Sequence, residues 1–188
     1  MGLMPAAANS DKLVAKFGNN NVVAIGLTLV CAGMLLFTTV EVDTEYLRIA
    51  LTFFILGLGM GLTMAPSTTL VMDSIPEDKA GVGSATNDAS REIGGALGIA
   101  IGGSVLNQIY QDNLVVPEEM ESYSAILTES FPAAMRIGLE MGNMELIANA
   151  RLAFMDGMVG SAMVSAIVAL ITAILVKFYM PRKSQQSN

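Results

Sequence analysis

Three ionisable residues, Asp88, Arg91 and Glu92, stand at the front of an apolar, glycine-rich stretch that continues from Ile93. Positions 88, 91 and 92 are spaced as i, i+3 and i+4, so in a helix all three side chains share one face. The guanidinium of Arg91 can neutralise one acid and leave the other free to titrate. The spacing therefore gathers three ionisable groups on one helix face, and such groups usually have a function if they lie within the membrane.

The depth of these three residues depends on where their helix begins. If the span begins near Val82, Glu92 lies ten residues in, about 15 Å at the helical rise and near mid-membrane. A charge at that depth costs about 2.5 to 3.5 kcal/mol, so it must face protein or water and usually has a function. If the span begins at Ile93, the three residues form an N-terminal turn at the cytoplasmic interface, where acids suit the helix dipole. Both interpretations stay open.

The composition is that of a membrane protein. Of the 188 residues, 53% are hydrophobic and only 14% are charged, which is typical of chains that lie in a bilayer. The chain has no histidine and a single cysteine, Cys31, which excludes a disulfide framework and argues against zinc or imidazole chemistry. We expect no metal and no other cofactor. An enzyme is the least favoured class, because no nucleophile with a base, metal cluster or phosphate loop is present.

Four stretches are long and apolar enough to cross a bilayer as helices, which takes about 20 residues each. They are residues 21–40, 47–72, 82–110 and 152–179. The second contains Pro66, where we expect a helix bend whose freed carbonyl is met by Ser67, Thr68 or a neighbouring helix. Barrel strands are excluded because the apolar runs are long and do not alternate. The predicted fold class is an all-α integral membrane protein with four transmembrane helices.

Residues 111–150, between the third and fourth spans, are too many for an ordinary connection. A proline followed by two acids at 117–119 is typical of a helix start, and a second short helix is expected over 132–141. We therefore expect an external acidic loop that folds as a helical hairpin. Whether this hairpin caps a pathway or only fills space stays open.

Lysine and arginine predict the orientation, because cytoplasmic loops are enriched in both. One side of the membrane receives Lys12, Lys16, Lys79, Lys177, Arg182 and Lys183, and the other receives only Arg48, Arg136 and Arg151. The first side is predicted to be cytoplasmic, with residues 1–20 forming the end of a preceding span and a cytoplasmic loop, and 180–188 a cytoplasmic tail. Acids gather in the outer segments, which explains the net charge of −7 as solvated loops without a basic partner. No nucleic-acid partner is expected.

Glycines mark the expected helix contacts. Gly94, Gly98 and Gly102 repeat every four residues, which lets another helix approach closely, and packing is favoured over a chemical role. The glycines at 57, 59 and 61 are interpreted in the same way. A dinucleotide-binding loop is excluded there because no strand precedes these glycines.

Two further sets of residues have a functional and a structural interpretation. Phe54, Met60 and Met64 are candidates for lining a cavity for an apolar ligand, and the alternative is that they are core or lipid-facing residues. Asp156 stands near the start of the last predicted span. We interpret it as a helix-start acid that suits the dipole, in preference to a transport residue.

Residues 57–105 read GLGMGLTMAPSTTLVMDSIPEDKAGVGSATNDASREIGGALGIAIGGSV. This stretch resembles the late part of a Major Facilitator Superfamily transporter, specifically the fourteen-span drug:proton antiporters that include the Qac-like multidrug exporters. In those proteins a glycine-rich twelfth span with a proline leads, through a short Pro-Glu cytoplasmic turn, into a thirteenth span of the form S/N-x-x-x-R-x-x-G-G-A-x-G. Residues 88–98 carry that match here.

The flanking segments fit the same resemblance. Residues 13–27, LVAKFGNNNVVAIGL, resemble the family's cytoplasmic loop L-x-D-R-x-G, with Lys16 at the basic position and Gly18 at the glycine. Ala15 stands where many members have an aspartate, which puts any gating salt bridge at that loop in doubt. Residues 111–150 resemble the external loop between the last two spans.

The resemblance implies a proton-coupled multidrug efflux antiporter in the cytoplasmic membrane that exports lipophilic compounds by alternating access. Asp88 and Glu92 correspond to acids that face the family's translocation path and serve proton coupling or cation recognition. Arg91 would tune their pKa or hold a helix contact. Many members are uncharged where Glu92 stands, so its presence implies a preference for cationic substrates. The implied partners are the bilayer, protons and a small lipophilic or cationic substrate.

Four spans are only part of such a transporter, whose halves surround a central site. The resemblance therefore implies a C-terminal fragment whose partners are the missing N-terminal spans of the same transporter. The alternative is a stand-alone four-span membrane protein that acts as a homo-oligomer or as a non-transporting partner of a larger transporter. Association through Gly94, Gly98 and Gly102 makes that alternative physically feasible.

Overall fold

The computed structural model describes residues 10, 12–41 and 43–180. Its elements are α2 (Asn19–Phe37), α3 (Tyr46–Asp73), the 3-10 turn η1 (Glu77–Lys79), α4 (Ala80–Asn113), η2 (Glu118–Tyr123), α5 (Ser124–Glu129), α6 (Phe131–Glu140) and α7 (Met144–Tyr179). Residues 12–17, ahead of α2, are also helical. The described residues contain no strand, so the predicted all-α class is confirmed. Most of the predicted tail, 181–188, and residues 1–9 of the predicted first segment lie outside the described residues.

Four of these helices, α2, α3, α4 and α7, are long and apolar enough to cross a membrane, with 19, 28, 34 and 36 residues. The predicted class with four helices of membrane length is thereby confirmed, while the exact bounds of the membrane spans stay predictions. The last helix starts at Met144, eight residues before the predicted position. Its start is set by Asn143, whose Oδ1 accepts from the Leu146 backbone N–H at 2.9 Å, a capping bond that satisfies a free N–H of the first turn. The connection between α4 and α7 is therefore residues 114–143.

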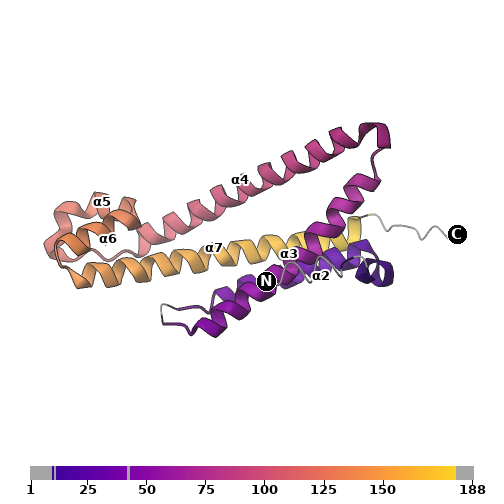
Figure 1. The fold of residues 1–188 in the computed structure, drawn as a ribbon. Helices are drawn as coiled ribbons and strands as arrows, with labels where there is room; N and C mark the ends of the chain where they lie inside the picture. The colour runs from indigo at the N-terminus through magenta and orange to yellow at the C-terminus, as the bar shows by residue number, and fades with distance from the viewer. Residues whose placement is uncertain (1–9, 11, 42, 181–188) are drawn as a thin grey trace.

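The helices do not pack equally. α2 packs against both α3 and α7, and α4 packs mainly against α7 (Figure 1). Gly26 of α2 and Gly59 of α3 face each other so closely that a Cβ on Gly59 would lie 2.6 Å from the Gly26 carbonyl oxygen. Gly157 of α7 faces α4 in the same way, with the Leu106 carbonyl oxygen 2.6 Å from the position of its Cβ, and Gly160 faces the side chain of Ile109. Such close backbone approach at small residues is typical of helix pairs in membranes.

α4 leaves the bundle over most of its length (Figure 1). Of its 34 residues, only Gly83 and Tyr110 are buried. The C-terminal third lies against α7, where Gly102 approaches Ser161 and Leu106 approaches Gly157. The N-terminal end contacts the rest of the chain near the η1 turn, where Gly83 faces Ile75 in the segment between α3 and η1. The fold therefore holds α4 closely at one end and loosely at the other.

Pro66 lies inside α3 without ending the helix. Because proline has no N–H, the Leu62 carbonyl lacks its usual helical donor. The hydroxyls of Ser67 and Thr68 donate to the carbonyls one turn earlier at 2.7 and 2.9 Å, and the Asn19 side chain of α2 donates to the Pro66 carbonyl at 3.4 Å. Hydroxyl groups and a neighbouring helix thus bond the carbonyls of Thr63, Met64 and Pro66 around the proline, while a partner for the freed Leu62 carbonyl and the bend itself stay predictions.

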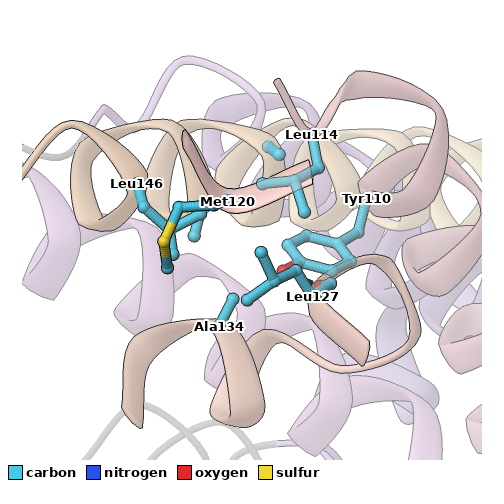
Figure 2. Packing of buried hydrophobic residues seen from close by; sticks show 8 residues of the cluster. Tyr110, Leu114, Met120, Leu127, Ala134 and Leu146 are labelled. Atoms are coloured by element: carbon cyan, nitrogen blue, oxygen red, sulfur yellow. Dashed lines mark hydrogen bonds between the residues drawn. The ribbon is translucent and has the colours of Figure 1, made fainter. Parts of the chain in front are cut away.

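Residues 114–143 form the predicted helical hairpin, with η2 and α5 in one arm and α6 in the other. Ser130 caps α6 by accepting from the Ala133 N–H at 3.5 Å, and Pro132 occupies the first turn, where its missing N–H costs nothing. In Figure 1 the hairpin sits at the end of the molecule where α4 and α7 meet. It packs on both helices through a shared hydrophobic core (Figure 2).

Candidate functional site

The three charged residues lie in the first half of α4. The helix begins at Ala80, so Glu92 is twelve residues in, about 18 Å along the helix axis. The helix dipole acts only within the first turn, so it does not explain these acids. All three side chains are exposed in this chain. The three residues are therefore not the first turn of their helix, while the place where the membrane span begins, near Val82 or at Ile93, stays open.

Arg91 is bonded to the neighbouring helix. Its Nη2 donates to Thr68 Oγ1 at 2.6 Å, and Thr68 in turn donates to the Met64 carbonyl of its own helix at 2.9 Å. Within the described part of the chain, no ion pair joins Arg91 to Asp88 or Glu92. Arg91 was expected either to tune the pKa of the two acids or to hold a helix contact. The bond to Thr68 is a helix contact. Both carboxylates remain without a cationic partner in the described residues.

The predicted glycine row divides into two parts. A Cβ on Gly102 would lie 2.9 Å from Ser161 Oγ, so Gly102 serves the contact between α4 and α7. A Cβ on Gly94 or Gly98 would meet nothing within 4 Å. The first two glycines therefore face open space in this chain, beside the turn that carries Glu92.

Phe54, Met60 and Met64, the candidates for cavity lining, are all exposed on α3. An apolar groove with a volume of about 320 Å³ is lined instead by two other residues of α3, Phe53 and Leu56. The remaining lining includes Met34, Phe37, Leu106, Met158, Ser161 and Ser165 from α2, α4 and α7. Sequence reasoning missed this groove because four helices contribute to it. The only available signal was the neighbouring Phe54, which points elsewhere because adjacent helical residues differ by about 100° in direction.

Asp156 is not a helix-start acid. Because α7 begins at Met144, Asp156 lies twelve residues inside the helix, beyond the reach of the dipole. Its Oδ2 accepts from Asn113 Nδ2 at 3.0 Å, which ties the last residue of α4 to α7.

Asp156 also lines a cavity of about 390 Å³ with Glu41 and Asp43 from the connection between α2 and α3. Sequence reasoning missed this grouping because more than a hundred residues separate its two parts. Among the described residues, no group of acidic or cysteine side chains is arranged to hold a metal ion.

Residues 1–99 match the model of the Major Facilitator Superfamily. The matched region is more than half of the chain and extends through α2, α3 and the part of α4 that carries Asp88, Arg91 and Glu92. The chain belongs to this superfamily. The resemblance of residues 57–105 to Major Facilitator transporters is thereby confirmed, and with its four apolar helices the chain is a multi-pass membrane protein.

Three relatives of this chain are named as drug efflux, transport or export proteins. The chain is 25% identical over 169 residues to the "Multidrug efflux pump LfrA" of Mycolicibacterium smegmatis, covering 88% of this chain and 34% of the relative. It is 33% identical over 125 residues to the "Multidrug transporter protein MdtP" of Bacillus subtilis, covering 62% and 23%. It is 26% identical over 189 residues to the "Tetracenomycin C resistance and export protein" of Streptomyces glaucescens, covering 94% and 35%. The chain thus spans about a quarter to a third of each relative.

Proposed function

We propose that this chain supplies four spans of a drug efflux transporter that exchanges protons for lipophilic, cationic compounds by alternating access. The family match and the names of its relatives support the drug efflux part of the proposal. The observation that carries the proton and cation part is the pair Asp88 and Glu92 on one face of a membrane-length helix, without a cationic partner in the described residues. Transport, not catalysis, is the activity proposed.

The mechanism follows from competition for a carboxylate. A proton and a cationic lipophile both neutralise an ionised acid, so each lowers the occupancy of the other. A proton entering from the outside would displace the bound cation, and the two conformations would differ in which side can reach the acid. The bond from Arg91 to Thr68 keeps the guanidinium away from the carboxylates, which leaves them available to a substrate.

The chain's partners in this proposal are the bilayer, protons, the substrate and the N-terminal spans of the same transporter. The relatives are more than twice as long as this chain, and a central site in such transporters lies between repeats. We propose a multi-pass arrangement in the cytoplasmic membrane with both termini inside, because the basic residues favour that orientation.

The test is the pair of variants Asp88→Asn and Glu92→Gln in the longest native polypeptide that contains this chain. We expect a large loss of proton-driven efflux of a cationic dye, with less loss for an uncharged substrate, because only the cation needs the negative charge. Glu121→Gln, an exposed acid of the hairpin, is the matched control and should transport normally. Unchanged dye efflux and unchanged pH dependence in both variants would refute the role of these acids.

The second candidate is the stand-alone four-span protein, and the open space at Gly94 and Gly98 favours it. A second copy, or a larger transporter, would then pack on that surface. An antibody to the tail PRKSQQSN distinguishes the candidates by the mass of the native polypeptide. A band at 19.7 kDa favours the stand-alone protein, and Gly98→Leu should then abolish its self-association in mild detergent. A band several-fold larger favours the transporter.

A further inference from the structure

A second groove, with a volume of about 400 Å³, lies between the start of α2 and the end of α7. The residues that line it include Phe17, Asn21 and Ile25 on one side and Leu170, Ile174 and Lys177 on the other. Its volume is within the range of ligand sites in proteins. The two walls are joined by Asn20, whose side-chain amide donates to the Lys177 carbonyl at 3.4 Å.

This groove faces away from both α3 and α4. On α2, Gly26 faces α3, and Asn21 and Thr28 of the groove lie on the opposite face because successive helical residues turn by about 100°. On α7, Gly157 faces α4, and Lys177 lies on the opposite face by the same count. The proposed transport path includes the charged residues of α4. The path and the spans that complete it therefore belong on the other side of the α2–α7 pair.

The groove is basic at one end and apolar at the other. Lys177 lines the end beside the last turn of α7, and Lys16 lies over the Phe17 ring with its Nζ 5.3 Å from the ring centroid. Neither lysine forms an ion pair within the described part of the chain. Further along the spans the walls are apolar, with Ile25 on α2 and Leu170 on α7. Leu170 is about 10 Å from Lys177 at the helical rise.

We propose that this groove binds an anionic phospholipid of the cytoplasmic leaflet, with the lipid phosphate between Lys16 and Lys177. One acyl chain lies along the apolar wall of Ile25, Leu170 and Ile174. Basic residues at the cytoplasmic ends of spans attract anionic headgroups, and the proposed orientation places both lysines in that leaflet. Another transmembrane span would cover the apolar wall but would leave the two lysines without an anion. The site depends on the proposed function only through this orientation.

The test uses the complete 188-residue chain in vesicles of phosphatidylcholine with a minor fraction of phosphatidylglycerol. The chain has no tryptophan, so Phe17→Trp places a single fluorescent reporter in the groove. Phe178→Trp is the matched control, because Phe178 adjoins Lys177 in α7 but does not line the groove. The brominated lipid, which quenches a tryptophan that it contacts, is phosphatidylglycerol in one sample and phosphatidylcholine at the same mole fraction in the other.

We expect brominated phosphatidylglycerol to quench the reporter at position 17 more strongly than brominated phosphatidylcholine does, with no such preference at position 178. In the chain with Phe17→Trp, Lys16→Gln and Lys177→Gln should each lower the relative binding constant for phosphatidylglycerol about five-fold. Both lysines are exposed, so these variants should fold normally. Lys79→Gln, at the start of α4, removes the same charge away from the groove and should leave the preference unchanged.

Two results would overturn the proposal. Equal quenching by the two lipids at position 17, or the same preference at positions 17 and 178, would show that no lipid site exists in the groove. The second result concerns the longest native polypeptide that contains this chain, where phosphatidylglycerol with a photoreactive acyl chain should crosslink to residues 17–28 and 170–177. Crosslinks confined to other segments would show that another span or a second copy of the chain fills the groove.

Discussion

At the scale of single residues, a glycine matters here only where another backbone approaches it. A Cβ on Gly59 would lie 2.7 Å from the Val30 backbone nitrogen and 2.6 Å from the Gly26 carbonyl oxygen, and backbone atoms cannot move aside as a flexible side chain can. Gly59→Ala should therefore force α2 and α3 apart and cost about 1 to 3 kcal/mol. The fall of the midpoint of thermal unfolding in detergent, followed by circular dichroism, measures this loss.

The matched control is Gly103→Ala, because a Cβ on Gly103 meets nothing within 4 Å. Alanine favours a helix over glycine by about 1 kcal/mol, so this variant should unfold at the same temperature or a higher one. Equal effects of the two substitutions would mean that the crossing of α2 and α3 is looser than the geometry indicates.

At the scale of elements, a capping residue sets where α7 begins. The bond from the Leu146 N–H to Asn143 Oδ1 at 2.9 Å starts α7 eight residues before the apolar run predicts. Asn143→Ala should cost about 1 kcal/mol and fray the first turn. Hydrogen exchange of the amides at 145–148 measures this fraying and should become faster. Asn107→Ala, at an exposed site inside α4, should leave those amides unchanged, and slow exchange in both variants would contradict the assigned cap.

At the scale of the whole molecule, the distribution of basic residues predicts which ends of the spans share a side of the membrane. With Cys31 replaced by alanine, a cysteine at Lys79 should react with an impermeant thiol reagent only after the cells are opened. A cysteine at Glu121 in the hairpin should react in intact cells, because the two positions lie at opposite ends of α4. Labelling of Lys79→Cys alone in intact cells would mean that the orientation is the reverse, with both termini outside. Labelling of both cysteines in intact cells would reject the predicted orientation.

The length of the apolar runs, the composition and a few short motifs determine the fold class and the main helices of this protein from the sequence alone. Four apolar runs, each about long enough to cross a bilayer, predicted α2, α3, α4 and α7 because a backbone without water must bond within its own helix. The proline and acids at 117–119, with a second short helix expected over 132–141, predicted the hairpin. The spacing of Asp88, Arg91 and Glu92 predicted their common face, since helical periodicity is a local property. The family resemblance rested on those same residues.

Only the tertiary structure decided which of these residues meet. Arg91 bonds Thr68 rather than a carboxylate, Gly102 contacts α7 while Gly94 and Gly98 do not, and Phe53 rather than Phe54 enters the groove. Asp156 pairs with Asn113 far along the chain. The reason is that periodicity sets the direction of a side chain relative to its own helix, whereas the crossing and tilt of a neighbouring helix depend on packing of side chains from distant segments.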